Sequence, residues 1–276
     1  EAQFLMAKLV DEYRQSSIFG VRAKRRFSDA IERYVDDNEH LASLSDNHTH
    51  LLTIKGVIGD LYLHEIHEES VKPFIEHRKK QGRKSKTVNN ALGVLRRVLK
   101  LAAGKWRDDN GLTWLESFPV IDNVDWRDSR KPAPISYEEQ DKLFDVMPPH
   151  LRAMCLFKVN TGCREQEVCQ LRWDWEYELK NSEHTLFILP EWLTKNREER
   201  LVIVNREAAK AIEMVRGQHP EFVFTYKGHG VTAINNTAWK NARKKVGLKH
   251  VRVHDLKHTF GKRLRAADVD FENRQD

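Results

Sequence analysis

The stretch Thr161–Trp173, TGCREQEVCQLRW, organises the chain because it places an arginine at a chain reversal. Residues 150–160 before it carry apolar side chains at helical spacing, which predicts a helix. Thr161 and the glycine after it break that helix, and Thr161 is a candidate N-cap for the next one. Arg164 would then lie in a first helical turn, where its guanidinium can contact two phosphate oxygens. A surface ion pair with Glu167 is the alternative interpretation of this arginine taken alone.

Two later stretches supply further cations. Lys195 lies in LTKN, between two short apolar runs, and His254 begins HDLKHTFGKRL. In this second stretch Leu256 and Phe260 are four residues apart, so we expect them to be buried together on one face of a helix. His254 and Lys257 would share another face. An isolated histidine of this kind is more often structural, but the arginine stretch favours a functional site.

The order Arg164, Lys195, His254 and Lys257 resembles the catalytic domain of the tyrosine recombinases, the phage integrase family of DNA breaking and joining enzymes. The resemblance implies that Arg164 and Lys257 clamp a phosphodiester and that His254 donates a hydrogen bond or moves a proton. Lys195 would be the general acid for the leaving oxygen, and Glu167 would orient the arginine helix. No metal and no other cofactor is implied, because the fixed cations replace the metal.

The sequence leaves one choice open in the turn that carries the lysine. Arg197 lies two residues after Lys195, and position alone does not choose between them. We favour Lys195 because an ammonium gives up a proton far more readily than a guanidinium.

Two departures from the family pattern bear on activity. The second cation of the family's HxxR motif is arginine, whereas Lys257 keeps the charge and loses the planar fork. The family's nucleophilic tyrosine lies beyond this helix, but the last tyrosine here is Tyr226, and eleven residues follow Arg265. The chain also starts at Glu1. We therefore expect a fragment without its nucleophile, which binds DNA and supplies most of the phosphate pocket but is inactive in strand cleavage.

Composition bounds the class of protein. The 276 residues are 40% hydrophobic, which argues against disorder, and 47 Lys and Arg against 41 Asp and Glu give a net charge of +6. This balance favours an anionic partner. The three cysteines form no CxxC pair, which argues against a zinc site or a disulfide framework. No apolar run of membrane-spanning length and no signal peptide is present, so a cytoplasmic protein, nucleoid-associated when bound to DNA, is expected.

The first part of the chain predicts a small helical bundle. Residues 1–20 are interpreted as a linker or the end of a preceding domain, with a short helix over residues 2–13. Residues 21–105 contain further helical patterns at 28–38, 48–63, 70–81 and after Ser85, with Ser28 and Ser70 as N-caps and Pro73 in a first turn. In size, position and charge this region resembles the DNA-clamping core-binding domain of the family.

One run in this bundle is entirely basic. Ten Lys and Arg and no acid lie between Arg78 and Lys105. Such a run is often only a solvated face, but the missing acids favour contact with DNA phosphates. The predicted contacts are Arg83, Lys84, Lys86, Arg96 and Arg97.

Residues 106–130 are acidic and rich in helix breakers, which predicts a linker, and the catalytic domain is expected at 131–276, truncated at its C-terminus. Ser136 is its first predicted N-cap. The runs at 184–190 and 200–205 predict a hairpin, and helices are expected at 206–217 and 232–246. A second basic stretch supplies the DNA contacts Lys240, Arg243, Lys244 and Lys245. The predicted fold is therefore mainly α with a small antiparallel β-sheet, a helical bundle followed by an α+β recombinase-like domain.

The expected function is a site-specific recombinase that cleaves and rejoins double-stranded DNA at an attachment site through a 3′-phosphotyrosyl intermediate, the intact protein acting as a homo-tetramer on DNA. The main alternative is a non-catalytic, sequence-specific DNA-binding protein derived from a recombinase. A relaxing enzyme similar to type IB topoisomerases shares the same residues. A metalloenzyme built on HEIHE, residues 64–68, is disfavoured because the histidines lack the HExxH spacing.

Overall fold

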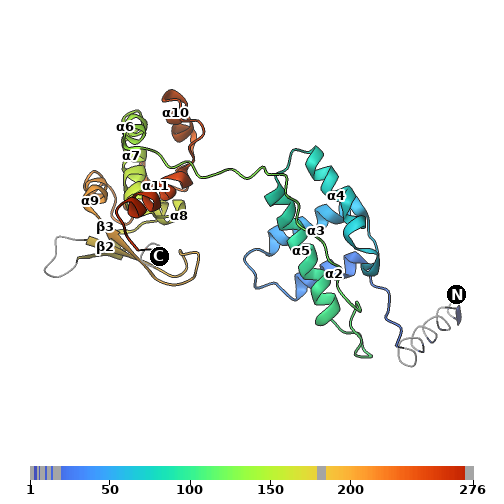
Figure 1. Cartoon of the computed structure of the whole chain (residues 1–276). Helices are drawn as coiled ribbons and strands as arrows, with labels where there is room; N and C mark the ends of the chain where they lie inside the picture. Colours follow the sequence, from blue (N-terminus) through green and yellow to red (C-terminus); the bar gives the residue numbers. More distant parts are fainter. Residues whose placement is uncertain are drawn as a thin grey trace. The chain divides into compact units, whose positions relative to one another are not determined.

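The computed structural model describes residues 20–178 and 185–270, together with residues 3, 4, 6, 10 and 14. The predicted helix over residues 2–13 falls outside the continuously described ranges. The chain divides into two compact units, residues 1–130 and 131–276 (Figure 1). No helix in the described ranges is long and apolar enough to cross a membrane.

Unit 1 is built from helices around one apolar core. These are α2 (Phe27–Asp36), α3 (Leu44–Ile58), α4 (Glu68–Lys80) and α5 (Ser85–Gly104), with a short 3₁₀ helix η1 (Leu63–Glu65) between α3 and α4. Each of these helices turns an apolar face toward the core. The fully buried residues of these faces include Phe27, Tyr34, Leu51, Phe74, Leu92, Leu95 and Leu99. Burial of these faces stabilises the bundle, because isolated helices of this length are marginal in water.

The predicted serine N-caps of this unit are wrong. Helix α2 begins one residue before Ser28, whose N–H and hydroxyl both donate to the carboxylate of Asp60, at 2.8 Å each. Helix α4 begins before Ser70, whose hydroxyl instead accepts from the N–H of His67 at 2.9 Å. Pro73 consequently lies in the second turn of α4 rather than in the first. Sequence pattern located these helices and misplaced their first turns.

Residues 106–130 pack on the bundle. Trp106, Leu115 and Ile121 belong to the core of unit 1, and the indole of Trp106 donates to Asp37 at 2.7 Å. The guanidinium of Arg96 donates to the carbonyl of Ile121 at 2.7 Å. The segment expected as a linker therefore covers one face of the bundle.

Unit 2 contains six α-helices within its described residues. They are α6 (Tyr137–Asp145), α7 (Pro149–Thr161), α8 (Glu165–Cys169), α9 (Arg206–Glu213), α10 (Thr237–Lys245) and α11 (Val253–Ala266). The predicted cap at Ser136 is confirmed, since its hydroxyl accepts from the N–H of Glu139 at 3.1 Å. Helix α9 ends four residues before Gly217, and α10 starts after an Asn236 cap, five residues later than predicted.

A small sheet covers one side of these helices. Strands β1 (Glu176–Glu178), β2 (Thr185–Leu189) and β3 (Arg200–Val204) lie in that order and are all antiparallel. The pairing of Phe187 with Val202 sets the register, which turns both side chains into the core. Strands β2 and β3 form the predicted hairpin, whereas β1 was not expected. A second hairpin joins β4 (Thr225–Tyr226) to β5 (His229–Gly230). The predicted fold class is confirmed.

Candidate functional site

The turn between α7 and α8 is shaped by one glycine. Gly162 has φ +68°, the left-handed conformation that ends a helix, and its N–H donates to the carbonyl of Lys158 at 3.0 Å. A Cβ at this position would lie 2.4 Å from Cδ1 of Phe260 in α11. Both the backbone conformation and the space against α11 therefore require glycine.

The predicted N-cap of α8 is wrong. Thr161 is the last residue of α7, and its hydroxyl donates to the carbonyl of Phe157 at 2.8 Å. Arg164 is the N-cap itself, and its N–H donates to the carboxylate of Glu167 at 2.6 Å. The helix therefore starts three residues later than predicted, and Arg164 precedes its first turn instead of lying within it.

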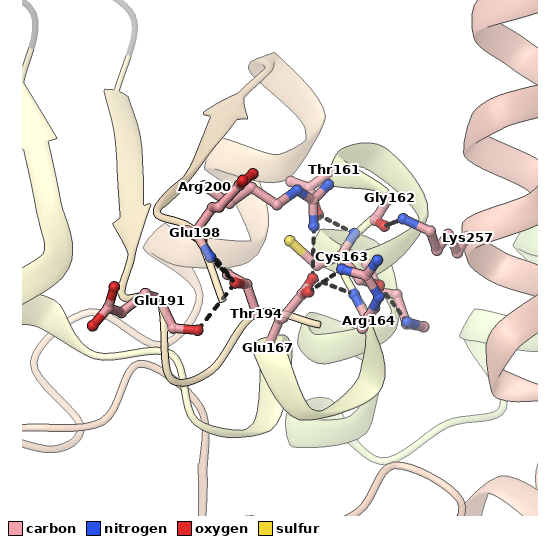
Figure 2. Close-up of polar contacts among 11 residues, drawn as sticks. Thr161, Gly162, Cys163, Arg164, Glu167, Glu191, Thr194, Glu198, Arg200 and Lys257 are labelled. Atoms are coloured by element: carbon pink, nitrogen blue, oxygen red, sulfur yellow. Dashed lines mark hydrogen bonds and ion pairs between the residues drawn. The ribbon is translucent and has the colours of Figure 1, made fainter. Parts of the chain in front are cut away.

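One buried carboxylate holds two arginines (Figure 2). Glu167 is 1% exposed, and its two oxygens accept from the guanidiniums of Arg164 and Arg200, each at 2.7 Å. Burial alone would raise the pKa of Glu167, but hydrogen bonds from Arg164 and the charges of both arginines outweigh it, so this pKa lies below its usual value. Glu167 is therefore an anion that fixes two guanidiniums side by side.

Helix α11 delivers Lys257 to the same turn. Its ammonium donates to the carbonyl of Gly162 at 2.9 Å, a contact drawn in Figure 2. Burial, followed by the charges of Arg200 and Arg164, lowers the pKa of Lys257. The structure thus brings Arg164 and Lys257 together, from segments that are about ninety residues apart in the sequence.

His254 lies one turn before Lys257 on α11 and is exposed. Its ring makes an edge-to-face contact with His258, with 4.8 Å between ring centroids. Partial burial of the ring, followed by the charges of His258, Lys158 and Lys257, lowers the pKa of His254. The neutral imidazole is therefore favoured near pH 7, and it can either accept or donate a hydrogen bond.

Lys195 occupies the turn between β2 and β3 and is exposed. The turn is anchored by Thr194, whose hydroxyl donates to the carbonyl of Glu198 at 2.7 Å (Figure 2). Thr194 and Asn196 line a cleft of about 310 Å³ that also contains Arg164, but Lys195 itself is not among the lining residues. The structure places Lys195 beside this cleft without bringing its ammonium to the arginine.

Two charged residues of this site were missed in the sequence. Arg200, the first residue of β3, is only 15% exposed at its side chain, and Lys158 of α7 is fully buried. The spacing of Lys158 after the buried Leu151 and Cys155 places it on the apolar face of a helix, which is an unusual place for an ammonium. That signal could have identified Lys158, whereas nothing in the sequence distinguishes Arg200 from an ordinary strand-edge cation.

The predicted DNA-contact residues fall into two groups. Arg96 and Arg243 are engaged in the fold: Arg96 contacts the 121–123 segment, and Arg243 donates to the carbonyl of Lys249 at 2.8 Å. Seven are exposed, namely Arg83, Lys84, Lys86, Arg97, Lys240, Lys244 and Lys245. Of these, Lys84 also donates to the carbonyl of Asp128 at 3.1 Å.

Comparison with known proteins places these features in a family context. Residues 135–276 match the model described as the phage integrase family. The integrase of Salmonella phage P22 is 23% identical over 308 residues, which cover 98% of this chain and 77% of the phage protein.

Solved structures share the fold across both units. A lambda integrase dimer bound to a COC′ core site has a TM-score of 0.71 at 13% identity, covering 97% of this chain and 76% of that one. The Tn1549 transposon integrase in complex with transposon right end DNA has a TM-score of 0.67 at 15% identity, covering 91% and 90%. XerH site-specific recombinase bound to a palindromic difH substrate has a TM-score of 0.65 at 18% identity, covering 83% and 70%.

Proposed function

Because the chain belongs to the phage integrase family, we propose that it is a site-specific DNA recombinase that cleaves and rejoins DNA through a 3′-phosphotyrosyl intermediate. The described residues would bind duplex DNA and supply most of the pocket for the scissile phosphate.

The observation that carries this proposal is an excess of fixed positive charge around one turn. Three cations, Arg164, Arg200 and Lys257, lie around the buried carboxylate of Glu167, whose oxygens pair with Arg164 and Arg200 at 2.7 Å each. Cations that repel one another are costly to gather unless an anion joins them. A phosphodiester is an anion that such a group of cations can bind.

The chemistry follows from where charge develops. Attack on a phosphodiester spreads negative charge over its non-bridging oxygens, and fixed cations stabilise that charge in the transition state. Arg164 and Lys257 are proposed to contact these oxygens, with Glu167 and Arg200 holding Arg164 in place. His254 is proposed to donate a hydrogen bond or to move a proton. Lys195 is proposed to protonate the leaving deoxyribose oxygen once DNA draws its turn toward the phosphate.

The nucleophile is proposed to be a tyrosine that follows the α11 helix in the native protein. All six tyrosines of the sequence precede His254, and the last of them is Tyr226. The ring of Tyr226 contacts that of His150 in a tilted arrangement with 4.4 Å between ring centroids, outside the cation cluster. A covalent intermediate would hold the 3′-phosphoryl end while strands are exchanged.

Unit 1 is proposed to grip the duplex as the core-binding domain, and the exposed basic residues of both units would contact its phosphates. Solved structures that this chain resembles support this arrangement. They contain recombinases with DNA, including a lambda integrase tetramer bound to a Holliday junction. A tetramer on DNA in the cytoplasm is the corresponding proposal for the intact protein.

The experiment that tests this function uses the chain extended into its native C-terminal sequence. Incubation with a nicked suicide duplex carrying the attachment site is expected to give a denaturant-resistant protein–DNA adduct. Substituting the downstream tyrosine by phenylalanine should abolish this adduct without abolishing DNA binding. Salt-sensitive binding with no adduct on any authentic site would contradict the recombinase function and would instead favour a DNA-binding protein without strand cleavage.

A further inference from the structure

Lys158 is a buried cation that the proposed chemistry does not use. It lies in the last turn of α7, and its side chain is fully buried. Its ammonium donates to the carbonyl of Cys163, and within the described residues no carboxylate forms an ion pair with it. Burying an ammonium without an acid is costly. Such a residue is expected where its charge serves a purpose other than stability.

The carbonyl that Lys158 holds belongs to the peptide unit that begins Arg164. That planar unit contains the carbonyl of Cys163 and the N–H of Arg164. Lys158 binds its oxygen, and Glu167 accepts from its N–H at 2.6 Å. Both ends of the peptide plane are therefore fixed by charged side chains, and the plane sets the direction in which the Arg164 side chain leaves the backbone.

A second lysine holds the preceding peptide unit. Lys257 donates to the carbonyl of Gly162 at 2.9 Å, and the N–H of Cys163 donates to the hydroxyl of Thr161 at 3.4 Å. Two successive carbonyls thus point at two ammonium groups, one from α7 and one from α11. Only Lys257 is partly exposed and able to reach a phosphate, whereas Lys158 is enclosed beneath the turn.

We propose that Lys158 is a positioning residue for Arg164. Protonated Lys158 acts through the Cys163–Arg164 peptide and holds the arginine in the geometry that binds the scissile phosphate. This inference deepens the proposed function and rests on it. Lys158 touches no reacting atom, so its effect passes entirely through the turn.

The protonation state of Lys158 makes this positioning dependent on pH. Burial is the main cause that lowers the pKa of Lys158 to about 8. An ammonium donates a stronger hydrogen bond to a carbonyl than a neutral amine does. The turn should therefore loosen as the pH rises above about 8, and the rate of strand cleavage should fall.

The other groups around Lys158 must be separated from it. Cys155 and Cys163 are buried thiols, and burial raises both of their pKa values, so they stay neutral near pH 8. The remaining neighbours are Glu165 of α8, and Lys257 and His254 of α11. Among these neighbours, Lys257 also has a pKa lowered by burial. Lys257 must therefore be substituted before a decline of the cleavage rate above pH 8 can be assigned to Lys158.

The first test is a double-mutant cycle in the adduct assay with the C-terminally extended protein. Lys158→Met keeps the apolar stem and is expected to slow adduct formation by at least about tenfold, because small misplacements of a catalytic group have large effects on rate. In an Arg164→Ala background the same substitution should have almost no further effect. Lys142→Met, an exposed lysine of α6, is the matched control and should leave the rate unchanged.

The second test needs no substitution at Lys158 itself. In a Lys257→Arg background, adduct formation should decline above pH 8 while the protein becomes more stable, because the unfolded lysine keeps its proton up to its ordinary pKa of 10.5 and the folded one only to about 8. Activity and stability therefore move in opposite directions over this range. In the Lys158→Met variant both trends should disappear.

The outcomes distinguish this inference from the function on which it rests. Two results would overturn the positioning role. One is that Lys158→Met slows adduct formation by the same factor in the presence and absence of Arg164, and the other is that adduct formation still declines above pH 8 in the Lys158→Met variant. If Lys158→Met does not fold, the pH series in the Lys257→Arg background decides. If the wild-type protein gives no adduct, the recombinase function fails, and the rise of Tm with inorganic phosphate then decides the positioning role. Arg164-dependent stabilisation that Lys158→Met abolishes would support it, and stabilisation that survives would overturn it.

Discussion

Glu167 is the side chain that joins the two arginines of the candidate site. It accepts from Arg164 and Arg200 while being almost fully buried. The sequence left a surface ion pair between Arg164 and Glu167 as the alternative to a functional arginine, and the structure shows that this pair exists with its carboxylate buried. In the proposed function the pair would support the phosphate pocket. A surface ion pair contributes little, whereas a buried carboxylate with several charged donors sets geometry.

Replacing Glu167 by glutamine tests this support. The folded-state pKa of Glu167 lies below its ordinary value of 4.5, so its stabilisation is present above pH 4.5 and is lost as the pH falls through the lower, folded-state pKa. We expect Glu167→Gln to lower the free energy of unfolding at pH 7 by about 1–3 kcal/mol and to flatten its dependence on pH below 4.5. Urea denaturation from pH 3 to 7 measures both. Glu138→Gln, at an exposed position on α6, is the control, and equal curves for the two variants would contradict this account.

Lys257 holds the position at which the family pattern has arginine. Its single ammonium already donates to the carbonyl of Gly162, so one group both fixes the turn and is proposed to contact the phosphate. An arginine has several donors in a planar fork and can make both contacts at once.

Substitutions at Lys257 should therefore differ in sign. We expect Lys257→Arg to form adduct at least as fast as the wild type, and Lys257→Met to slow it by about 10²–10³ because a cation at the transition state is lost. Initial rates of adduct formation at pH 7 give the comparison. A rate for Lys257→Met equal to that of the wild type would remove Lys257 from the site.

At the level of elements, the site depends on how α11 packs on the end of α7. Phe260 covers Gly162, and Lys257 binds its carbonyl. The same helix is anchored at Asp255, which accepts from the N–H of Ala133 at 3.2 Å, and at Thr259, which accepts from the N–H of Ile135 at 3.1 Å. Helix α11 is thus held on two sides, which fixes the height of Lys257 over the turn.

Gly162→Ala should disturb this packing. The substitution meets a left-handed backbone conformation and places a Cβ 2.4 Å from the Phe260 ring, so we expect a loss of about 2–4 kcal/mol in the free energy of unfolding. Gly261→Ala is the matched control, because that helical position has open space and alanine should stabilise it by about 0.5–1 kcal/mol. Thermal and urea unfolding measure the stability of both variants. A Gly162→Ala variant as stable as the wild type would show that Phe260 does not exclude a side chain at this position.

The helices and strands of both units were largely predictable from the periodicity of apolar residues, but the residues at which they begin and end were not. The apolar spacing before residue 161 predicts α7, and two β-branched runs predict β2 and β3. The predicted caps failed for two different reasons. Ser28 makes a long-range hydrogen bond to Asp60, whereas the hydroxyl of Thr161 donates to a carbonyl in the preceding turn of its own helix. Strand β1 was missed because Glu176–Glu178 has no apolar alternation and exists only through pairing with β2.

The site was predictable in proportion to how much of it lies in motifs. Arg164, His254 and Lys257 could be proposed from short patterns, and the structure brings Arg164 and Lys257 to one turn. Arg200 could not be foreseen, because its role exists only through the register of β3 beside α8. The placement of Lys195 outside the cleft lining depends on a turn, which sequence spacing does not define.

For the whole molecule, charge is distributed over two units with separate cores. Each unit has a basic stretch whose exposed members point to solvent, Lys86 and Arg97 in one and Lys240 and Lys244 in the other. A two-unit protein with cations on both parts suits a duplex, whose phosphates are accessible from all sides. The proposed catalysis, however, depends on the cluster of cations around Glu167.

Catalysis by this cluster is tested by the rate of covalent adduct formation by the C-terminally extended protein carrying Arg164→Ala. Arg152→Ala, at an exposed arginine of α7 that pairs with Asp145, is the matched control. We expect Arg164→Ala to slow adduct formation by about 10²–10³ while the protein still folds and binds DNA, and the control to form adduct at the wild-type rate. Adduct formation by Arg164→Ala at the wild-type rate would rule out a catalytic role for this arginine.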